Sequence, residues 1–332
     1  MLSVRYEHTT RLVLDSLMQA GRDFVSGEAL SQRLGVTRAG LWKRIKNLRE
    51  LGYIIEGHTA KGYRIFSAPD NPYPWALLDG EDEFWRDAVY YKNTDSTNTV
   101  AVGMASRGAV EGTVVVAESQ TAGRGRLGRM WVSPPGNNIY ISAILRPDMP
   151  PYISPQITLV AGVAVARTVE KVTGIRAGIK WPNDLLLNGK KFCGILTEMN
   201  SESDKINFIV LGIGVNLNST IKEYPAEIAD NITTLKDVTG RNIPRVEFTM
   251  ALLGELKKMY KEFLRHGFSN IKKEWSGYFC MSGKDVVISY LDKKVEGTAL
   301  GIDNSGALLV RKSDDKIERV LSGDVMFLRR RT

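Results

Sequence analysis

A short segment of the chain, residues 123–129 (GRGRLGR), combines glycines with three arginines. Glycine lets a backbone approach a ligand closely, and an arginine guanidinium presents paired donors that match a carboxylate or a phosphate. The spacing also fits the dinucleotide fingerprint G-x-G-x-x-G, which requires a helix directly after the third glycine. Pro134 and Pro135 argue against that helix. The segment therefore predicts a loop that folds over an anionic ligand, and a solvated basic surface loop is the alternative.

Two lysines belong to a hairpin predicted further along the chain. Residues 180–184 (KWPND) lead into an apolar strand, and Asn188-Gly189 between apolar runs is a strong hairpin signal. Side chains alternate along a strand, so Lys191, Cys193 and Ile195 are expected on one face and Lys190 on the other. One lysine can therefore point at a ligand. Cys193 is interpreted as a core residue, since no histidine lies near it in the sequence to activate a thiol.

A third segment, residues 212–218 (GIGVNLN), reads as a strand with glycines at alternate positions. Such spacing leaves bare backbone on one face of a strand. We expect a ligand to lie against it.

The first 66 residues predict the elements of a winged helix-turn-helix. Helices are expected over 9–20, over 26–34 with a stop at Gly35, and from a cap at Thr37 to Gly52, followed by strands at 53–55 and 62–65. Residues 1–68 carry eleven basic and six acidic side chains, so +5 of the net charge of +8 lies here, which favours a polyanionic partner. A three-helix interaction module is the alternative. The candidate DNA contacts are Gly27, Thr37, Arg38, Trp42, Lys43, Arg44 and Lys46.

The remaining chain divides into a linker and two further domains. Residues 67–79 are rich in proline and predict an extended linker. Residues 80–279 alternate strands with long helices and predict a mixed α/β domain. Residues 280–332 contain short strands between Gly, Asp and Asn turns and predict a small β-barrel.

Composition excludes several classes of protein. The 332 residues are 43% hydrophobic and 25% charged, which is typical of a globular multidomain chain and not of a disordered one. Two cysteines and three scattered histidines argue against a disulfide framework or a His/Cys metal site and favour a reducing cytosol. The longest uncharged run, residues 149–166, is interrupted by prolines and predicts no membrane span. We therefore expect a cytoplasmic protein.

Five segments of the sequence, in this order, resemble the successive signatures of biotin protein ligases. They are residues 95–98 (DSTN), 120–129 (QTAGRGRLGR), 180–184 (KWPND), 191–196 (KFCGIL) and 212–216 (GIGVN). Together with the N-terminal helix-turn-helix, they make the chain resemble the bifunctional bacterial form, which is both biotin ligase and biotin operon repressor. The resemblance covers essentially the whole chain. It implies a class II synthetase-like central domain and an SH3-like C-terminal barrel.

The resemblance also implies the chemistry. Biotin carboxylate would attack the α-phosphate of ATP, giving biotinyl-5′-AMP and pyrophosphate, and a lysine of biotin carboxyl carrier protein, an acetyl-CoA carboxylase subunit or its equivalent, would then attack the mixed anhydride. Mg²⁺ would accompany ATP. The second partner would be a palindromic operator DNA, bound by a homodimer. The chain's arginines, lysines and glycines suit positioning and charge stabilisation rather than nucleophilic catalysis.

Residue roles follow from the same resemblance. The implied biotin site comprises Ser96, Thr97, Asn98, Gln120, Arg124, Gly125, Arg126, Lys191 and Gly194. The implied ATP and adenylate contacts are Arg129, Lys180, Asn183 and Asn216. The implied catalytic residues are Arg126, bridging carboxylate and phosphate, with Lys191 and Lys180 as point charges. Asp184 is a candidate for Mg²⁺ or for the carrier lysine's proton, although Asn183 and Asp184 fit a capped turn equally well.

Two positions depart from the family pattern. Leu127 stands where some relatives have arginine or lysine, which leaves its part in dimer contacts open. Residues 231–235 (NITTL) lack the tryptophan that some relatives place before this run, so no adenine-stacking residue is assigned. Two other functions stay open at this point: a biotin-sensing regulator without catalysis, and a lipoate ligase.

Overall fold

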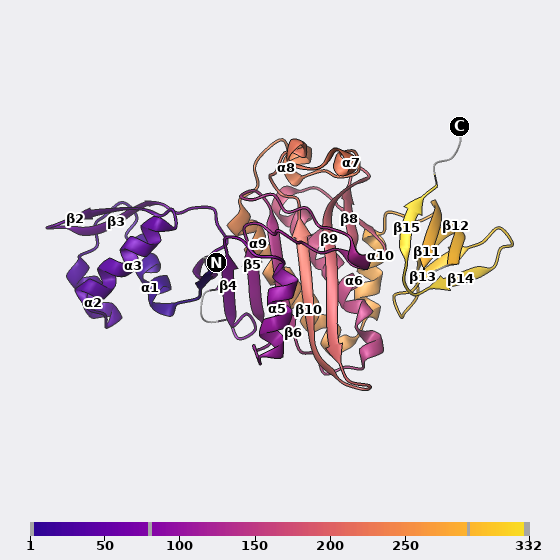
Figure 1. The fold of residues 1–332 in the computed structure, drawn as a ribbon, viewed down its shortest axis with the longest axis horizontal. Helices are drawn as coiled ribbons and strands as arrows, with labels where there is room; N and C mark the ends of the chain where they lie inside the picture. Colours follow the sequence, from indigo (N-terminus) through magenta and orange to yellow (C-terminus); the bar gives the residue numbers. More distant parts are fainter. Residues whose placement is uncertain (1–2, 79–81, 291–292, 329–332) are drawn as a thin grey trace.

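The computed structural model describes residues 3–78, 82–290 and 293–328, which form three domains in chain order (Figure 1). The N-terminal domain contains three helices and a two-stranded wing, the central domain is built on an eight-stranded sheet, and the C-terminal domain is all β. The predicted fold class is confirmed. No helix among the described residues is long and apolar enough to cross a membrane.

The N-terminal elements begin and end close to the predicted limits. They are α1 (His8–Gln19), α2 (Gly27–Leu34), α3 (Arg38–Glu50), β2 (Ile54–His58) and β3 (Gly62–Ser67). The side chains of Ser26 and Thr37 cap α2 and α3, and Gly35 ends α2 in the left-handed conformation. Gly62 has φ +99°, and a Cβ there would lie 2.0 Å from the Val25 carbonyl oxygen. Glycine is thus required where the wing meets the helices.

The central sheet has the order β1-β4-β5-β6-β10-β9-β8-β7, and only the β4/β5 pair is parallel. Its strands are β1 (Ser3–Arg5), β4 (Asp87–Tyr91), β5 (Thr113–Ala117), β6 (Ile139–Leu145), β7 (Gly178–Lys180), β8 (Asp184–Leu187), β9 (Lys190–Ser201) and β10 (Ile206–Val215). β1 comes from the N-terminal end of the chain, before α1, yet it pairs with β4. Residues 3–5 therefore belong to the sheet of the central domain.

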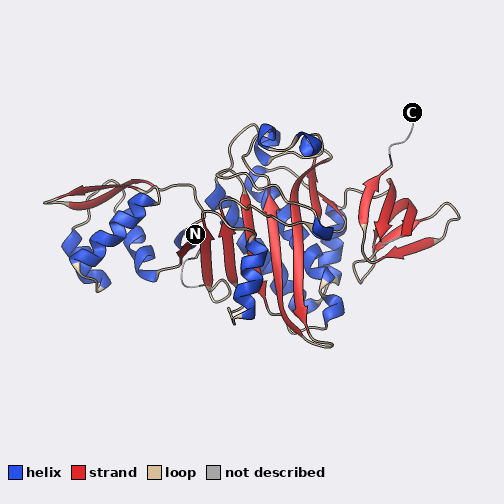
Figure 2. Cartoon of the chain, in the orientation of Figure 1, coloured by secondary structure: helices blue, strands red, loops and turns tan. Residues whose placement is uncertain are grey.

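Helices cover both faces of this sheet (Figure 2). α5 (Thr97–Ser106) packs on one face, where Ala101 and Met104 join Val115 and Val210 in a small core. α6 (Pro155–Thr173), α9 (Arg245–His266) and α10 (Ser269–Tyr278) cover the other face and enclose the larger core. Shorter helices are α4 (Pro74–Leu77), η1 (Arg126–Gly128), η2 (Pro151–Ile153), η3 (Ile221–Glu223), α7 (Ala226–Ala229) and α8 (Leu235–Thr239).

The proline-rich segment after β3 packs between the first two domains. Tyr73 and Trp75 are buried, and they donate hydrogen bonds to the Leu51 carbonyl oxygen (3.0 Å) and the Tyr53 hydroxyl (2.8 Å) of the N-terminal domain. On the other side, Asp70 accepts from the first backbone amides of α9. The segment is thus held on both sides.

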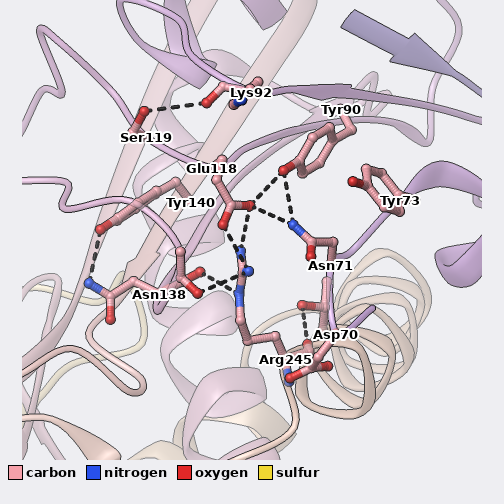
Figure 3. Close-up of polar contacts among 12 residues, drawn as sticks. Asp70, Asn71, Tyr73, Tyr90, Lys92, Glu118, Ser119, Asn138, Tyr140 and Arg245 are labelled. Carbon is pink, nitrogen blue, oxygen red and sulfur yellow. Dashed lines mark hydrogen bonds and ion pairs between the residues drawn. The ribbon is translucent and has the colours of Figure 1, made fainter. Parts of the chain in front are cut away.

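A buried ion pair continues this connection into the central domain (Figure 3). Arg245 donates to both carboxylate oxygens of Glu118, at 3.0 and 2.9 Å, and Tyr90 and Asn71 donate to the same carboxylate. Glu118 lies two residues before Gln120. The network therefore joins the interdomain segment to the chain that enters the glycine–arginine loop.

The C-terminal domain is a five-stranded antiparallel sheet in the order β14-β13-β12-β11-β15. Its strands are β11 (Asp285–Tyr290), β12 (Lys293–Ile302), β13 (Leu308–Arg311), β14 (Ile317–Val320) and β15 (Asp324–Phe327). Trp181 donates from its indole to the Gly306 carbonyl oxygen (2.9 Å) and anchors this domain to the central one.

Candidate ligand pocket and DNA-binding face

One pocket of the central domain gathers most of the residues singled out by sequence. Its walls come from the N-terminus of α5, the glycine–arginine loop, the β7–β8 turn and strands β9 and β10. The predicted residues that line it are Ser96, Thr97, Asn98, Gln120, Arg124, Gly125, Arg126, Arg129, Asn183, Asp184, Lys191 and Gly194. Asp324 of β15 also lines it, so the C-terminal domain closes one side.

Hydrogen bonds fix the wall at the start of α5. The Thr97 amide donates to Gln120 Oε1 at 2.8 Å, and Gln120 Nε2 donates to Ser133 Oγ at 2.9 Å. The Ser96 side chain does not cap the helix, although Ser96 holds the N-cap position. The polar groups of this wall thus come from three separate segments of the chain.

The glycine–arginine loop forms a tight turn over the pocket. The Gly125 amide donates to the Arg129 carbonyl oxygen at 2.7 Å, and Leu127 takes φ 54°. Arg126 donates to Asn183 Oδ1 and to the Gly323 carbonyl oxygen, both at 3.3 Å. Burial lowers the pKa of the Arg126 guanidinium, and the nearby carboxylates of Asp324 and Asp184 oppose that shift. Arginine remains charged at any ordinary pH, so a partly desolvated cation faces the pocket.

Lys191 points into the pocket because of a β-bulge, which simple alternation of side chains along the strand did not predict. Leu185 pairs with Cys193 but Leu186 pairs with Lys191, so β9 bulges at Phe192. The bulge turns Lys191 to the side of Gly194, where a Cβ would lie 3.3 Å from the lysine Nζ, while Cys193 is fully buried. The expectation that Lys191 and Cys193 share a face was therefore wrong, because a bulge breaks the two-residue period. The interpretation of Cys193 as a core residue is confirmed, and burial raises the pKa of its thiol.

Lys191 is paired within the pocket. Its Nζ lies 2.6 Å from Asp184 Oδ1 and 5.4 Å from the centre of the Trp131 ring. Asp184 is thus neutralised by a lysine, and no group of three or more His, Cys, Asp or Glu side chains that could hold a metal occurs in the described part of the chain.

Trp131 is a pocket residue that sequence reasoning missed. A Cβ at Gly214 would lie 2.4 Å from its indole, and one at Gly212 would lie 2.1 Å from Asn98 Oδ1. The bare backbone expected to receive a ligand is therefore covered by two side chains of the protein itself. The alternate glycines were a usable signal, because they mark where large side chains approach a strand closely. Asp324 gave no such signal, since it lies almost two hundred residues from the loop that it meets.

Lys180 and Asn216 lie outside the residues that line the pocket. Lys180 Nζ lies 5.7 Å from the ring centre of Phe327 in the C-terminal domain, and burial lowers the pKa of its ammonium group. Asn216 is buried, and its Oδ1 has no hydrogen-bond partner among the described residues. An unpaired buried amide oxygen is costly. Both residues flank the pocket without opening into it.

The exposed face of α3 carries four of the seven predicted DNA contacts, Arg38, Trp42, Lys43 and Lys46. Trp42, Lys43 and Lys46 are exposed, and Lys46 Nζ lies 5.7 Å from the Trp42 ring. Arg38 pairs with Glu28 of α2 at 2.8 Å, which leaves it on the surface. Arg44 is turned away from this face, toward the Gly40 carbonyl oxygen and Glu7.

The other two candidate DNA contacts are structural residues of the helix-turn-helix. Gly27 begins α2 beneath the Tyr63 ring, and Thr37 accepts a hydrogen bond from the Gly40 amide (3.0 Å). The helix-turn-helix thus presents an aromatic and cationic surface.

Comparisons with known proteins match the N-terminal, central and C-terminal domains separately. Residues 90–216 match the family model described as "Biotin/lipoate A/B protein ligase family". Residues 9–64 match an "HTH domain" model, and residues 281–328 match a "Biotin protein ligase C terminal domain" model. Each of the three domains therefore has its own family match.

Relatives are similar over almost the whole chain. The bifunctional ligase/repressor BirA of Bacillus subtilis is 39% identical over 320 residues, which cover 94% of this chain and 97% of that protein. The protein of the same name from Escherichia coli is 30% identical, with 96% and 97% covered. Among solved structures, the biotin protein ligase from Aquifex aeolicus in complex with biotin and ATP aligns with a TM-score of 0.64 and 31% identity, over 73% of this chain and 98% of that one.

Proposed function

This chain belongs to the biotin protein ligase family, in its bifunctional ligase/repressor form, and from that premise we propose that it attaches biotin to a carrier-protein lysine with ATP and represses transcription by binding operator DNA. The observation that supports the ligase activity most directly is the pocket itself. It combines a wall of hydroxyl and amide groups with the half-buried cations of Arg126 and Lys191. Such a site suits a ligand that has a neutral polar ring at one end and a carboxylate at the other.

The first step would be adenylation. The biotin carboxylate attacks the α-phosphate of ATP, the bond to the β-phosphate oxygen breaks, and pyrophosphate leaves. Arg126 would bind carboxylate and phosphate together, because its guanidinium offers two donors in one plane. Lys191 would add a point charge to the developing adenylate, and Arg129 would meet the pyrophosphate. Positioned charges of this kind stabilise a phosphoryl-transfer transition state without a protein nucleophile.

In the second step, the neutral amine of the carrier lysine attacks the mixed anhydride, and AMP leaves. The carrier would be a biotin carboxyl carrier protein, since Paracoccus denitrificans and Mycobacterium tuberculosis relatives are named biotin–[acetyl-CoA-carboxylase] ligases. Asp184 would receive the proton of the incoming amine, and its position in the pocket beside Lys191 supports this role.

Mg²⁺ would enter with ATP and neutralise phosphate charge. It is usually bound through one or two carboxylates together with phosphate oxygens. Asp184 and Asp324 supply carboxylates at the pocket, and they are the residues that fit this role. Asp324 pairs with Arg129 and Asp184 with Lys191, so the phosphates would exchange these ion pairs for their own.

A pyrophosphate-release assay with purified protein, biotin and ATP tests the ligase. Release that requires both substrates, followed by labelling of a carrier protein, is the expected result. Binding of biotin without release would favour the non-catalytic regulator. Lipoate is the other alternative substrate, and efficient competition by lipoate would favour that ligase.

Lys180 flanks the pocket, and as the ATP contact that the resemblance implies it would give the adenylation step a pH dependence. Burial holds the pKa of its ammonium group below the usual value, so the charge is lost at a lower pH than for an exposed lysine. We expect the KM for ATP to rise on the alkaline side in wild type, and Lys180→Arg to move that rise to higher pH, because arginine keeps its charge. Steady-state kinetics from about pH 7 to about pH 10 measure this effect. Identical profiles in the two proteins would contradict a role for Lys180 in ATP binding.

The repressor function would use the exposed face of α3. A single winged helix makes few phosphate contacts, so tight operator binding needs two copies on a palindromic site. We propose that ligand binding promotes this homodimer. Leu127 and Met130, on the loop that covers the pocket, are 73% and 76% exposed. A ligand that orders this loop would fix the two apolar side chains in one surface, to which a second copy of the chain would bind. Sedimentation and gel-shift titrations with and without biotin and ATP test the coupling, which equal operator affinity in the two conditions would contradict.

Lys43→Ala should weaken operator binding several-fold and lower the slope of the logarithm of affinity against the logarithm of salt concentration by about 1, as for one lost phosphate contact. Lys43 is exposed on α3, in a different domain from the pocket, so pyrophosphate release should not change. Lys258→Ala removes an exposed lysine of α9 and is the matched control. Gel shifts at several salt concentrations on the same preparations measure both effects. A Lys43 variant that binds operator like Lys258→Ala would show that Lys43 contacts no DNA.

A further inference from the structure

Glu198 of β9 contacts two segments of the pocket through one carboxylate oxygen. Asn98 Nδ2 donates to Glu198 Oε2 at 2.7 Å, and Arg124 Nη2 donates to the same oxygen at 2.9 Å. Asn98 lies in the first turn of α5, and Arg124 lies in the glycine–arginine loop. Glu198 therefore ties the fixed wall of the pocket to the loop that covers it. The resemblance to biotin ligases assigned no role to Glu198.

The contact with Glu198 fixes the orientation of the Asn98 amide. A carboxylate oxygen accepts hydrogen bonds, so Asn98 must turn its NH₂ group toward Glu198 and its carbonyl oxygen away. The NH₂ group also lies 3.4 Å from the Leu196 carbonyl oxygen, which is a weak contact. Asn98 is 3% exposed, so its amide cannot exchange these partners for water.

The orientation of Asn98 sets the direction of the next hydrogen bonds. Ser142 Oγ lies 2.6 Å from Asn98 Oδ1 and 2.8 Å from Thr97 Oγ1. A hydroxyl has one proton and an amide oxygen only accepts, so Ser142 donates to Asn98. The Thr97 proton is then used toward Ser142 or toward Gln120 Oε1, which lies 3.2 Å away. In both arrangements the Thr97 hydroxyl presents lone pairs, and no proton, to the pocket.

Glu198 also affects the charge of the loop. Arg124 is paired with Glu198, whereas Arg126 is half-buried and donates to Asn183 and the Gly323 carbonyl oxygen. The cation placed to meet a ligand carboxylate is then Arg126, because the charge of Arg124 is matched by that of Glu198.

We propose that Glu198 is a positioning residue for biotin: through Asn98 and Ser142 it makes Thr97 a hydrogen-bond acceptor for an N–H group of the biotin ureido ring, and it holds Arg124 away from the ligand carboxylate. This inference rests on the proposed biotin ligase function. It predicts an effect on biotin affinity and none on ATP affinity. The hydrogen bonds from Glu198 through Asn98 and Ser142 to Thr97 lie on the α5 side of the pocket, and Arg124 is not among the residues assigned to ATP.

The test compares Glu198→Gln with wild type in steady-state pyrophosphate release. A glutamine at this position can offer Asn98 either an oxygen or an NH₂ group, and it has no charge to pair with that of Arg124. We expect the KM for biotin to rise about 10- to 100-fold, the range for losing a charged hydrogen bond. The KM for ATP should stay within about twofold. Glu202→Gln, an exposed position just beyond β9, is the matched control and should behave as wild type.

A reciprocal variant separates positioning from a merely structural role. Asn98→Asp alone places two carboxylates against each other, and we expect it to lose more biotin affinity than Glu198→Gln. In the double variant that carries both substitutions, the introduced amide can donate to the introduced carboxylate. That carboxylate still accepts from Ser142, so the Thr97 hydroxyl keeps its direction. The double variant should therefore recover at least part of the affinity that Asn98→Asp loses.

The outcomes distinguish the two proposals. Wild type that neither binds biotin nor releases pyrophosphate would overturn the proposed function together with this inference. Active wild type with an unchanged KM for biotin in Glu198→Gln would overturn the role of Glu198 alone. An equal rise in the KM for both substrates, or no recovery in the double variant, would also overturn it, because either result describes a loosened fold.

Discussion

Replacing Arg126 by alanine is expected to slow adenylate formation about 10²- to 10³-fold, the loss seen when one preorganised donor to a transition-state charge is removed. The effect is large because this guanidinium is half-buried and faces the pocket beside Asn183 and Asp324. The wall of α5 stays intact in the variant, so biotin affinity should fall less than the rate. Single-turnover pyrophosphate release and biotin titration on the same protein measure the two quantities.

Two further variants make that result specific. Arg126→Lys keeps the charge but loses the paired donors, so it should recover only part of the rate. Arg311→Ala removes an exposed arginine of β13 in the C-terminal domain and should leave the rate unchanged. Unchanged biotin affinity together with unchanged pyrophosphate release in Arg126→Ala would refute the proposed role of Arg126.

Deletion of residues 1–66 is expected to abolish operator binding while adenylate synthesis continues. All the residues that line the pocket follow residue 95, and all the exposed candidate DNA contacts precede residue 47. The deletion also removes Leu51 and Tyr53, which accept hydrogen bonds from Tyr73 and Trp75. The buried side chains of Tyr73 and Trp75 would then be exposed to water. This exposure should lower the free energy of unfolding by roughly 2 kcal/mol for each side chain.

The truncated protein should therefore melt at a lower temperature and bind biotin less tightly, because the Asn71–Glu118–Arg245 network leads from the exposed segment to Gln120. Carrier biotinylation, operator gel shift and thermal unfolding on one preparation measure the three effects. A soluble, folded truncation without any ligase activity would show that the two activities cannot be assigned to separate segments of the chain.

The sequence by itself determined the parts of the structure that depend on local chemistry. The limits of α2 and α3 followed from Ser26, Gly35 and Thr37, because caps and left-handed glycines act within one turn of a helix. The glycine–arginine loop, the lysine hairpin and the α5 segment were found as separate short patterns, and the structure brings most of their residues to one pocket. Each pattern could be read from a short run of consecutive residues.

Tertiary structure alone decided which residues meet across long sequence distances. The bulge at Phe192 depends on pairing with β8 and turns Lys191 into the pocket, while Trp131 covers Gly194 and Gly214 of neighbouring strands. Asp324 reaches the loop from another domain, and Glu198 meets Asn98 a hundred residues away. Local periodicity contains no information on such contacts, because they arise only when the sheet and the domains are packed together. For this reason the sequence indicated the ligand and the chemistry, and the folded chain decided which side chains position them.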